Sequence, residues 1–164
     1  MTKITGSAFW SRSSALLVAS AGMAVATGFG SWVSLAKDVR AEPFGIDTKL
    51  SVPTSLKLGL GSGLAAPWPM PLVALATAMA ALRAGDSPRP ARVCQTIGWM
   101  LFCGTLVEPV TWSRRLRHPL IKATVAANLF AGAALIVAGS RAAVSPRSWP
   151  NRRQPGASPQ PRKS

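Results

Sequence analysis

The chain has 164 residues, of which 48% are hydrophobic, and its formal net charge is +14. This length suits one domain, and the apolar content excludes a disordered polar polymer. Four apolar runs, at about 13–36, 58–82, 93–113 and 120–140, contain only two charged residues, Glu108 and Lys122. A soluble helical protein needs charged helix faces to meet water. The sequence therefore predicts an all-α membrane protein with four transmembrane helices in a single domain, residues 1–140.

The basic residues point to lipid as the partner of this chain. A strongly basic protein can bind nucleic acid through phosphate contacts, but here the basic residues flank the apolar runs, where they can meet lipid phosphates and resist translocation. We therefore expect a lipid bilayer as partner and no nucleic acid. The flanking residues are Arg12, Lys37, Arg83, Arg92, Arg114, Arg115, Lys122 and Arg141.

The cysteine and histidine content argues against a metal or cofactor. Cys94 and Cys103 are nine residues apart in one predicted helix, which places them on opposite faces and about 13 Å apart along the axis, too far for a disulfide. The chain has one histidine, so zinc and haem sites lack ligands. We expect no metal and no cofactor.

The first apolar run, 13–36, is predicted to span a membrane. Trp10 and Trp32 are 22 residues apart, about 33 Å in a helix, which matches the spacing of the two interfacial aromatic belts. The alternative is a cleaved signal peptide with Lys3 and Arg12 as its basic start. The run is longer than the roughly 7 to 15 apolar residues of such a signal, so a membrane span is the preferred interpretation.

The second run, 58–82, is predicted to be broken. Alternating prolines cannot lie inside one regular helix, because each removes a backbone donor and restricts the preceding residue. The sequence predicts a glycine-rich segment near 56–66 and a helix near 71–84, joined by an extended or kinked stretch. The connector before this run, 37–57, is expected to be a loop. The alternating residues are Gly59, Gly61, Gly63, Pro67, Pro69 and Pro71.

The third and fourth runs are joined by a short basic hairpin, with Trp112 at the interface and Pro119 at the start of the last helix. Small residues spaced four apart let membrane helices approach closely, so these rows predict contacts within a four-helix bundle. The rows are Gly22 and Ala26, Ala74 and Ala78, Ala76 and Ala80, and Ala123, Ala127 and Ala131.

Residues 141–164 are predicted to form a disordered tail. The segment has six basic residues, five prolines and no acidic residue, and it carries no periodic apolar pattern that would bury a core. Such a tail is attracted to anionic lipid headgroups. The alternative is that its charge only retains the C-terminus in the cytoplasm.

The candidate polar site within the membrane centres on Glu108. Glu108 lies about 6 Å inside the interface marked by Trp112, and Asn128 about 12 Å in from Pro119. An intramembrane carboxylate is a functional candidate by default. Its candidate partners are Arg114, Arg115, Lys122 and the Asn128 amide. The preferred interpretation is an ion-pair anchor with Arg115, and the alternatives are a proton or solute site or a contact with a partner protein. Candidate pocket-lining residues are Trp68, Trp99, Gly61 and Gly63.

These features favour an accessory or structural membrane component without catalytic activity, with a membrane protein or a second copy of the chain as partner. The alternative is a small transporter or a lipid- or ligand-binding protein that uses Glu108 and the broken second span, because discontinuous helices often form substrate sites. An enzyme is the least favoured class, since no catalytic constellation can be recovered from spacing.

We predict a bacterial cytoplasmic-membrane protein with both termini in the cytoplasm. In the four-span arrangement, eleven basic residues lie on the side of the termini and eight on the other side, and the more basic side is the cytoplasmic one. Cysteines introduced at positions 47 and 158 should be labelled from opposite sides of the membrane. Labelling of both from the same side would contradict the four-span arrangement.

Overall fold

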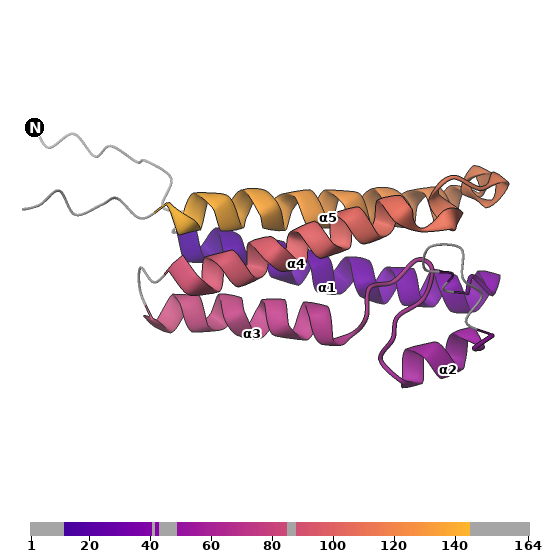
Figure 1. Ribbon diagram of the computed structural model, residues 1–164, viewed down its shortest axis with the longest axis horizontal. Coiled ribbons are helices and arrows are strands. Elements are labelled where there is room, and N and C mark those ends of the chain that lie inside the picture. Colours follow the sequence, from indigo (N-terminus) through magenta and orange to yellow (C-terminus); the bar gives the residue numbers. More distant parts are fainter. Residues whose placement is uncertain (1–11, 41, 43–48, 85–87, 145–164) are drawn as a thin grey trace, which may run out of the picture.

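The computed structural model of the chain is all-helical over the residues that it describes, which are 12–40, 42, 49–84 and 88–144. The long helices are packed side by side and run alternately in opposite directions (Figure 1). Their main contacts follow the order α1, α3, α4, α5 and back to α1, and α1 also touches α4. The helices are α1 (Arg12–Lys37), α2 (Val52–Lys57), α3 (Pro69–Ala84), α4 (Pro88–Val107), α5 (Pro119–Ala143) and the 3-10 helices η2 (Pro109–Thr111) and η3 (Arg114–Arg117). Trp10 and the predicted tail beyond Val144 lie outside the described residues.

Two helices, α1 and α5, are long and apolar enough to cross a membrane. Helix α3 is apolar but has only 16 residues, about 24 Å against a hydrocarbon thickness of about 30 Å. Helix α4 has 20 residues, but Arg89 and Arg92 lie in its first turns. The fold is thus all-helical with two candidate membrane-spanning helices.

Helix α4 ends earlier than its apolar run predicts. It stops at Val107 rather than continuing to residue 113, because Pro109 has no N–H to continue the helical hydrogen bonds. The carbonyl of Thr105, which position 109 would otherwise bond, accepts a hydrogen bond from Thr111 Oγ1 at 2.6 Å. The next carbonyl, of Leu106, accepts one from Trp112 Nε1 at 2.6 Å. Side chains of the following turn therefore cap α4.

The connector and the start of α3 also differ from the prediction. The region expected to be a loop contains the short helix α2, which begins after Ser51, whose Oγ accepts the Thr54 N–H. Helix α3 begins at Pro69, two residues before the predicted start. Proline is tolerated at this end of a helix because the first N–H groups have no intrahelical partner.

Glycines form the closest helix contact of the bundle, between α4 and α5. A Cβ at Gly98 would lie 2.9 Å from the carbonyl oxygen of Gly132, and one at Gly139 would lie 2.8 Å from that of Ala91. Of the predicted small-residue rows, Ala74 and Ala78 of α3 are completely buried. Ala123 is exposed. The sequence pattern therefore located the α3 contact but missed the glycine contact of α5.

We predict that Gly98→Ala destabilises the bundle by about 1–3 kcal/mol, because the added methyl group forces α4 away from the α5 backbone. Thermal unfolding of the full chain in mild detergent, followed by circular dichroism, measures the effect. Gly104→Ala in the same helix is the matched control, since nothing lies within 4 Å of its added Cβ. The control should keep or raise the midpoint because alanine favours helix; equal loss in both variants would contradict the close contact.

Candidate functional site

The segment between α2 and α3, residues 58–68, has irregular backbone that folds into a tight turn. Ser62 and Ala65 exchange backbone hydrogen bonds of 2.9 and 3.1 Å. Gly61 has a φ of +81°, a left-handed conformation that favours glycine. A Cβ at Gly61 would lie 2.4 Å from the carbonyl oxygen of Ala65. Glycine is therefore required at the entry to this turn, which explains one of the alternating glycines.

Helices α1 and α5 hold this segment from both sides. The buried Asn128 of α5 donates a hydrogen bond from Nδ2 to the carbonyl oxygen of Leu64 at 2.9 Å. Ser62 Oγ and Ser34 Oγ of α1 are 2.7 Å apart. The Leu64 carbonyl lies so close to Gly30 that a Cβ there would be 2.1 Å from its oxygen. Residues 61 and 64–66 of the irregular backbone are thus buried in protein, and the turn is hydrogen-bonded to its neighbours, the condition under which such backbone is tolerated within a membrane.

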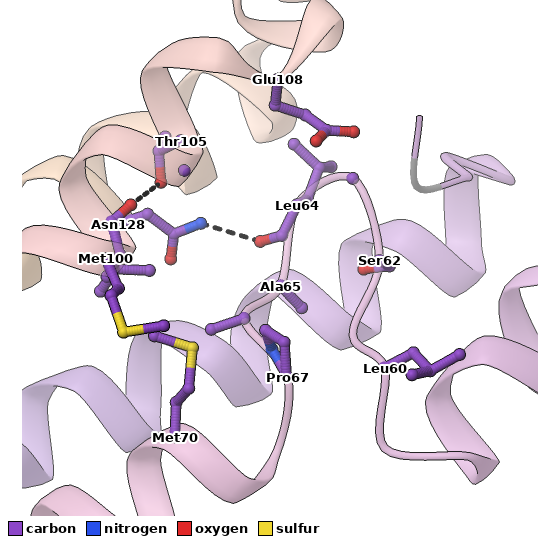
Figure 2. A pocket seen from close by; sticks show the side chains of 14 residues that line it. Leu60, Ser62, Leu64, Ala65, Pro67, Met70, Met100, Thr105, Glu108 and Asn128 are labelled. Atoms are coloured by element: carbon purple, nitrogen blue, oxygen red, sulfur yellow. Dashed lines mark hydrogen bonds between the residues drawn. The ribbon is translucent and has the colours of Figure 1, made fainter. Parts of the chain in front are cut away.

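A cavity of about 220 Å³ lies between this segment, the end of α4 and α5. Figure 2 shows Asn128 and Thr105 on one side of it and the Leu64–Pro67 stretch on the other. Two methionines, Met70 and Met100, line its far end (Figure 2). The lining residues are Leu60, Ser62, Gly63, Leu64, Ala65, Ala66, Pro67, Met70, Met100, Leu101, Gly104, Thr105, Glu108 and Asn128.

Asn128 has a free acceptor in this cavity. Its side chain is 3% exposed, and its Oδ1 has no hydrogen-bond partner among the described residues. The amide orientation is fixed, because the Leu64 carbonyl accepts from Nδ2 and would repel an oxygen in that place. A buried polar atom without a partner costs free energy. Asn128 therefore binds the Leu64 carbonyl through Nδ2, and its Oδ1 is available to accept a hydrogen bond from a donor.

Glu108 lies beyond the last residue of α4, in the connector to η2. Its half-buried carboxylate accepts a hydrogen bond at Oε1 from the backbone N–H of Glu42, at 2.9 Å. Burial raises the pKa of Glu108 above its ordinary value, and the Glu42 N–H opposes that effect. The side chain is thus placed outside the helix that the sequence predicted for it, at the junction of the connector and the cavity.

The two candidate arginine partners are placed differently. Arg114 lies in a separate, open hollow with Trp112, Arg117 and Lys122. The side chain of Arg115, the proposed ion-pair partner of Glu108, lies outside the described part of the chain. Within the described part, the basic side chain beside Glu108 is Arg40, which shares a neighbouring hollow with it and pairs with Asp38 at 3.8 Å.

Of the other candidate residues, some line the cavity and others only shape the surrounding structure. Gly63 lines the cavity, but Gly61, Trp68 and Trp99 are not among its described lining residues. Trp99 is 50% exposed on the outer face of α4 and packs edge-on against Phe102. Gly61 instead shapes the turn that forms one wall.

Several residues that line the cavity were not predicted from the sequence. Thr105 could have been found in part, because it lies three residues before Glu108 and so near it on one helix face. Met70 and Met100 could not, since they come from different helices. The single histidine, His118, has a structural role: its Nδ1 accepts the Leu120 N–H at 3.3 Å and caps α5.

No protein-family model, no curated protein and no solved structure matches this chain. The site is therefore interpreted from the chemistry of its own residues.

We predict that Glu108 keeps its proton to a higher pH than an ordinary glutamate, whose pKa is roughly 4.3. The carboxyl infrared band assigned with Glu108→Gln should titrate above that value in lipid. Because the folded state then holds a proton that the unfolded chain has lost, the free energy of unfolding should fall as pH rises between the two pKa values. Glu108→Gln should remove this slope; a band already ionised at the ordinary value would favour the ion-pair anchor.

Proposed function

We propose that this chain is a four-span integral membrane protein that binds a small ligand in the cavity beside Asn128 and Glu108. The membrane part of the proposal is supported by the outer surface of the bundle. Large apolar side chains point outward on every long helix, among them Val25 at 73%, Leu72 at 60% and Phe130 at 78% exposure. Apolar surface on this scale is costly in water and suits lipid.

The interior supports the same proposal. Small and polar side chains lie inside the bundle, including the fully buried Ser20, Thr27, Ser34 and Thr124. Small residues within and large apolar residues outside are typical of helix packing in lipid, where association depends on close packing and hydrogen bonds. We infer that α3 and α4 cross together with α1 and α5, the irregular segment 58–68 completing the crossing of α3.

The unpartnered Oδ1 of Asn128 carries the binding part of the proposal. This oxygen lines a cavity between helices, which is a usual place for ligand sites. The cavity also borders the irregular backbone that precedes α3, and broken helices often form substrate sites. Glu108 is the single ionisable residue among the described lining residues. Binding is therefore a better fit than catalysis, which needs a second acid, base or nucleophile.

An accessory role through helix contacts is the second candidate, favoured by a different observation. An apolar groove of about 250 Å³ lies between α1 and α5 and is lined by small residues flanked by phenylalanines. Such a groove can accept a partner helix or a lipid chain. Its lining residues are Ala19, Gly22, Val25, Ala26, Phe29, Ala127, Phe130, Ala131 and Ala134.

We predict that the chain retains a small molecule after mild detergent extraction and that Gly104→Leu removes it. Gly104 lines the cavity, and nothing lies within 4 Å of its added Cβ, so a leucine side chain fills the space without displacing backbone. Native mass spectrometry of the full-length protein measures the retained mass.

Gly28→Leu in α1 is the matched control. An added Cβ at Gly28 also meets open space, but Gly28 does not line this cavity among the described residues. The control should retain the small molecule. A stoichiometric protein partner with no small-molecule mass in either variant would favour the accessory role instead.

A further inference from the structure

The polar side chains that line the cavity can accept hydrogen bonds but have few protons to give. Thr105 Oγ1 donates its proton to the Leu101 carbonyl at 2.8 Å. Ser62 Oγ donates to Ser34 Oγ at 2.7 Å. Both hydroxyl oxygens keep lone pairs. A ligand that meets these groups must therefore bring the donors.

Asn128 and Glu108 strengthen this bias. The Asn128 amide donates a hydrogen bond to the Leu64 carbonyl, and its Oδ1 has no partner among the described residues. Glu108 uses Oε1 for the Glu42 N–H, and its second carboxylate oxygen has no hydrogen bond among the described residues. None of the described residues that line the cavity is basic. The polar side of the site thus attracts a positively charged donor.

The charges around Glu108 leave its carboxylate available. Arg40 lies in the neighbouring hollow with Glu42, but its guanidinium pairs with Asp38. A half-buried carboxylate without a cation is costly, so a cationic ligand would offset this cost.

The remaining wall is apolar. Met70 and Met100 line one end of the cavity, and Pro67 and Leu60 border the segment side (Figure 2). Methionine side chains are flexible and polarisable, and they adapt to apolar ligands of varied shape. The volume of about 220 Å³ is below the usual range for drug-sized ligands, so the occupant is small.

We propose that the cavity binds a small primary ammonium compound with a short alkyl part. Its N–H groups meet the acceptors on the Asn128 and Glu108 side, and its alkyl part packs against Met70 and Met100. This inference rests on the ligand-binding role proposed above and names the class of ligand.

Butylammonium is the probe for this proposal, with the full chain in lipid nanodiscs and methionine methyl groups labelled for NMR. The methyl signals of Met70 and Met100 should shift saturably. Those of Met23, buried in the core, and Met79, exposed on α3, should not. Butanol has the same alkyl chain without charge, and tetramethylammonium has charge without N–H donors; both should bind at least about ten-fold more weakly, as expected when a charged hydrogen bond is lost.

Glu108→Gln tests the charge, because glutamine keeps an acceptor for the Glu42 N–H. It should weaken butylammonium binding about ten-fold. Glu42→Gln changes the net charge equally but lies outside the described lining of the cavity, and it should change the affinity less than about two-fold. If Glu108→Gln does not fold, Gly104→Leu should abolish the shifts by filling the same site.

Equal shifts with butanol or tetramethylammonium would overturn the ammonium proposal and leave a ligand-binding cavity of other specificity. A binding loss in Glu42→Gln as large as in Glu108→Gln would overturn the assignment of the charge to Glu108. If none of the three probes shifts Met70 or Met100, and no small molecule is retained after extraction, both this inference and the binding function fail, and buried water is the partner of Asn128.

Discussion

The hydrogen bond from Asn128 to the Leu64 carbonyl is the contact on which the irregular half of the bundle depends. Three glycines and Pro67 prevent residues 58–68 from satisfying their own backbone in a helix. Residues 64–66 are buried, and a buried carbonyl needs a donor. Asn128 supplies it from α5, while Gly30 lets α1 approach the same carbonyl where a Cβ would be only 2.1 Å away. The Asn128 donor on α5 and the Gly30 position on α1 together accommodate backbone that helical turns of α3 would otherwise satisfy.

The glycine contact between α4 and α5 is a second constraint of the same kind. Gly98 and Gly132 bring the two backbones close, which fixes the position of the α4 end relative to Asn128. Because Thr105 and Glu108 follow Gly98 along α4 by about two and three turns, a shift of this contact would move both of them away from the segment wall. Packing at the middle of α4 thus sets the geometry of the cavity at its C-terminal end.

The sequence predicted the helical class, the four apolar segments and the break before α3, because charge placement and proline spacing are local signals. It also singled out Glu108, Asn128 and Gly63, which the structure places around one cavity. It did not predict that α4 stops at Val107, since the capping by Thr111 and Trp112 depends on how the chain turns after Pro109. The partners Glu42 and Leu64 were also missed, because they lie 66 and 64 residues away from Glu108 and Asn128 and no periodicity encodes such pairings. The expectation of Arg115 as the partner of Glu108 concerns a side chain outside the described residues.

Three segments of the chain meet at Gly63, at the polar end of the bundle. A Cβ there would lie 2.5 Å from the Arg40 carbonyl oxygen and 3.3 Å from Glu108 Oε1, so the connector after α1, the turn before α3 and the end of α4 converge on this residue. The Glu42 N–H adds a hydrogen bond between two of these segments. Glu108 therefore contacts both the connector and the turn directly. At the opposite end, the bundle is closed by apolar packing around Leu16, Ala81 and Ala91 and by the Arg12 guanidinium on the Val144 carbonyl, where no comparable cluster of acceptors lies among the described residues. The polar groups on which the proposed binding depends thus lie at the end that carries the irregular segment.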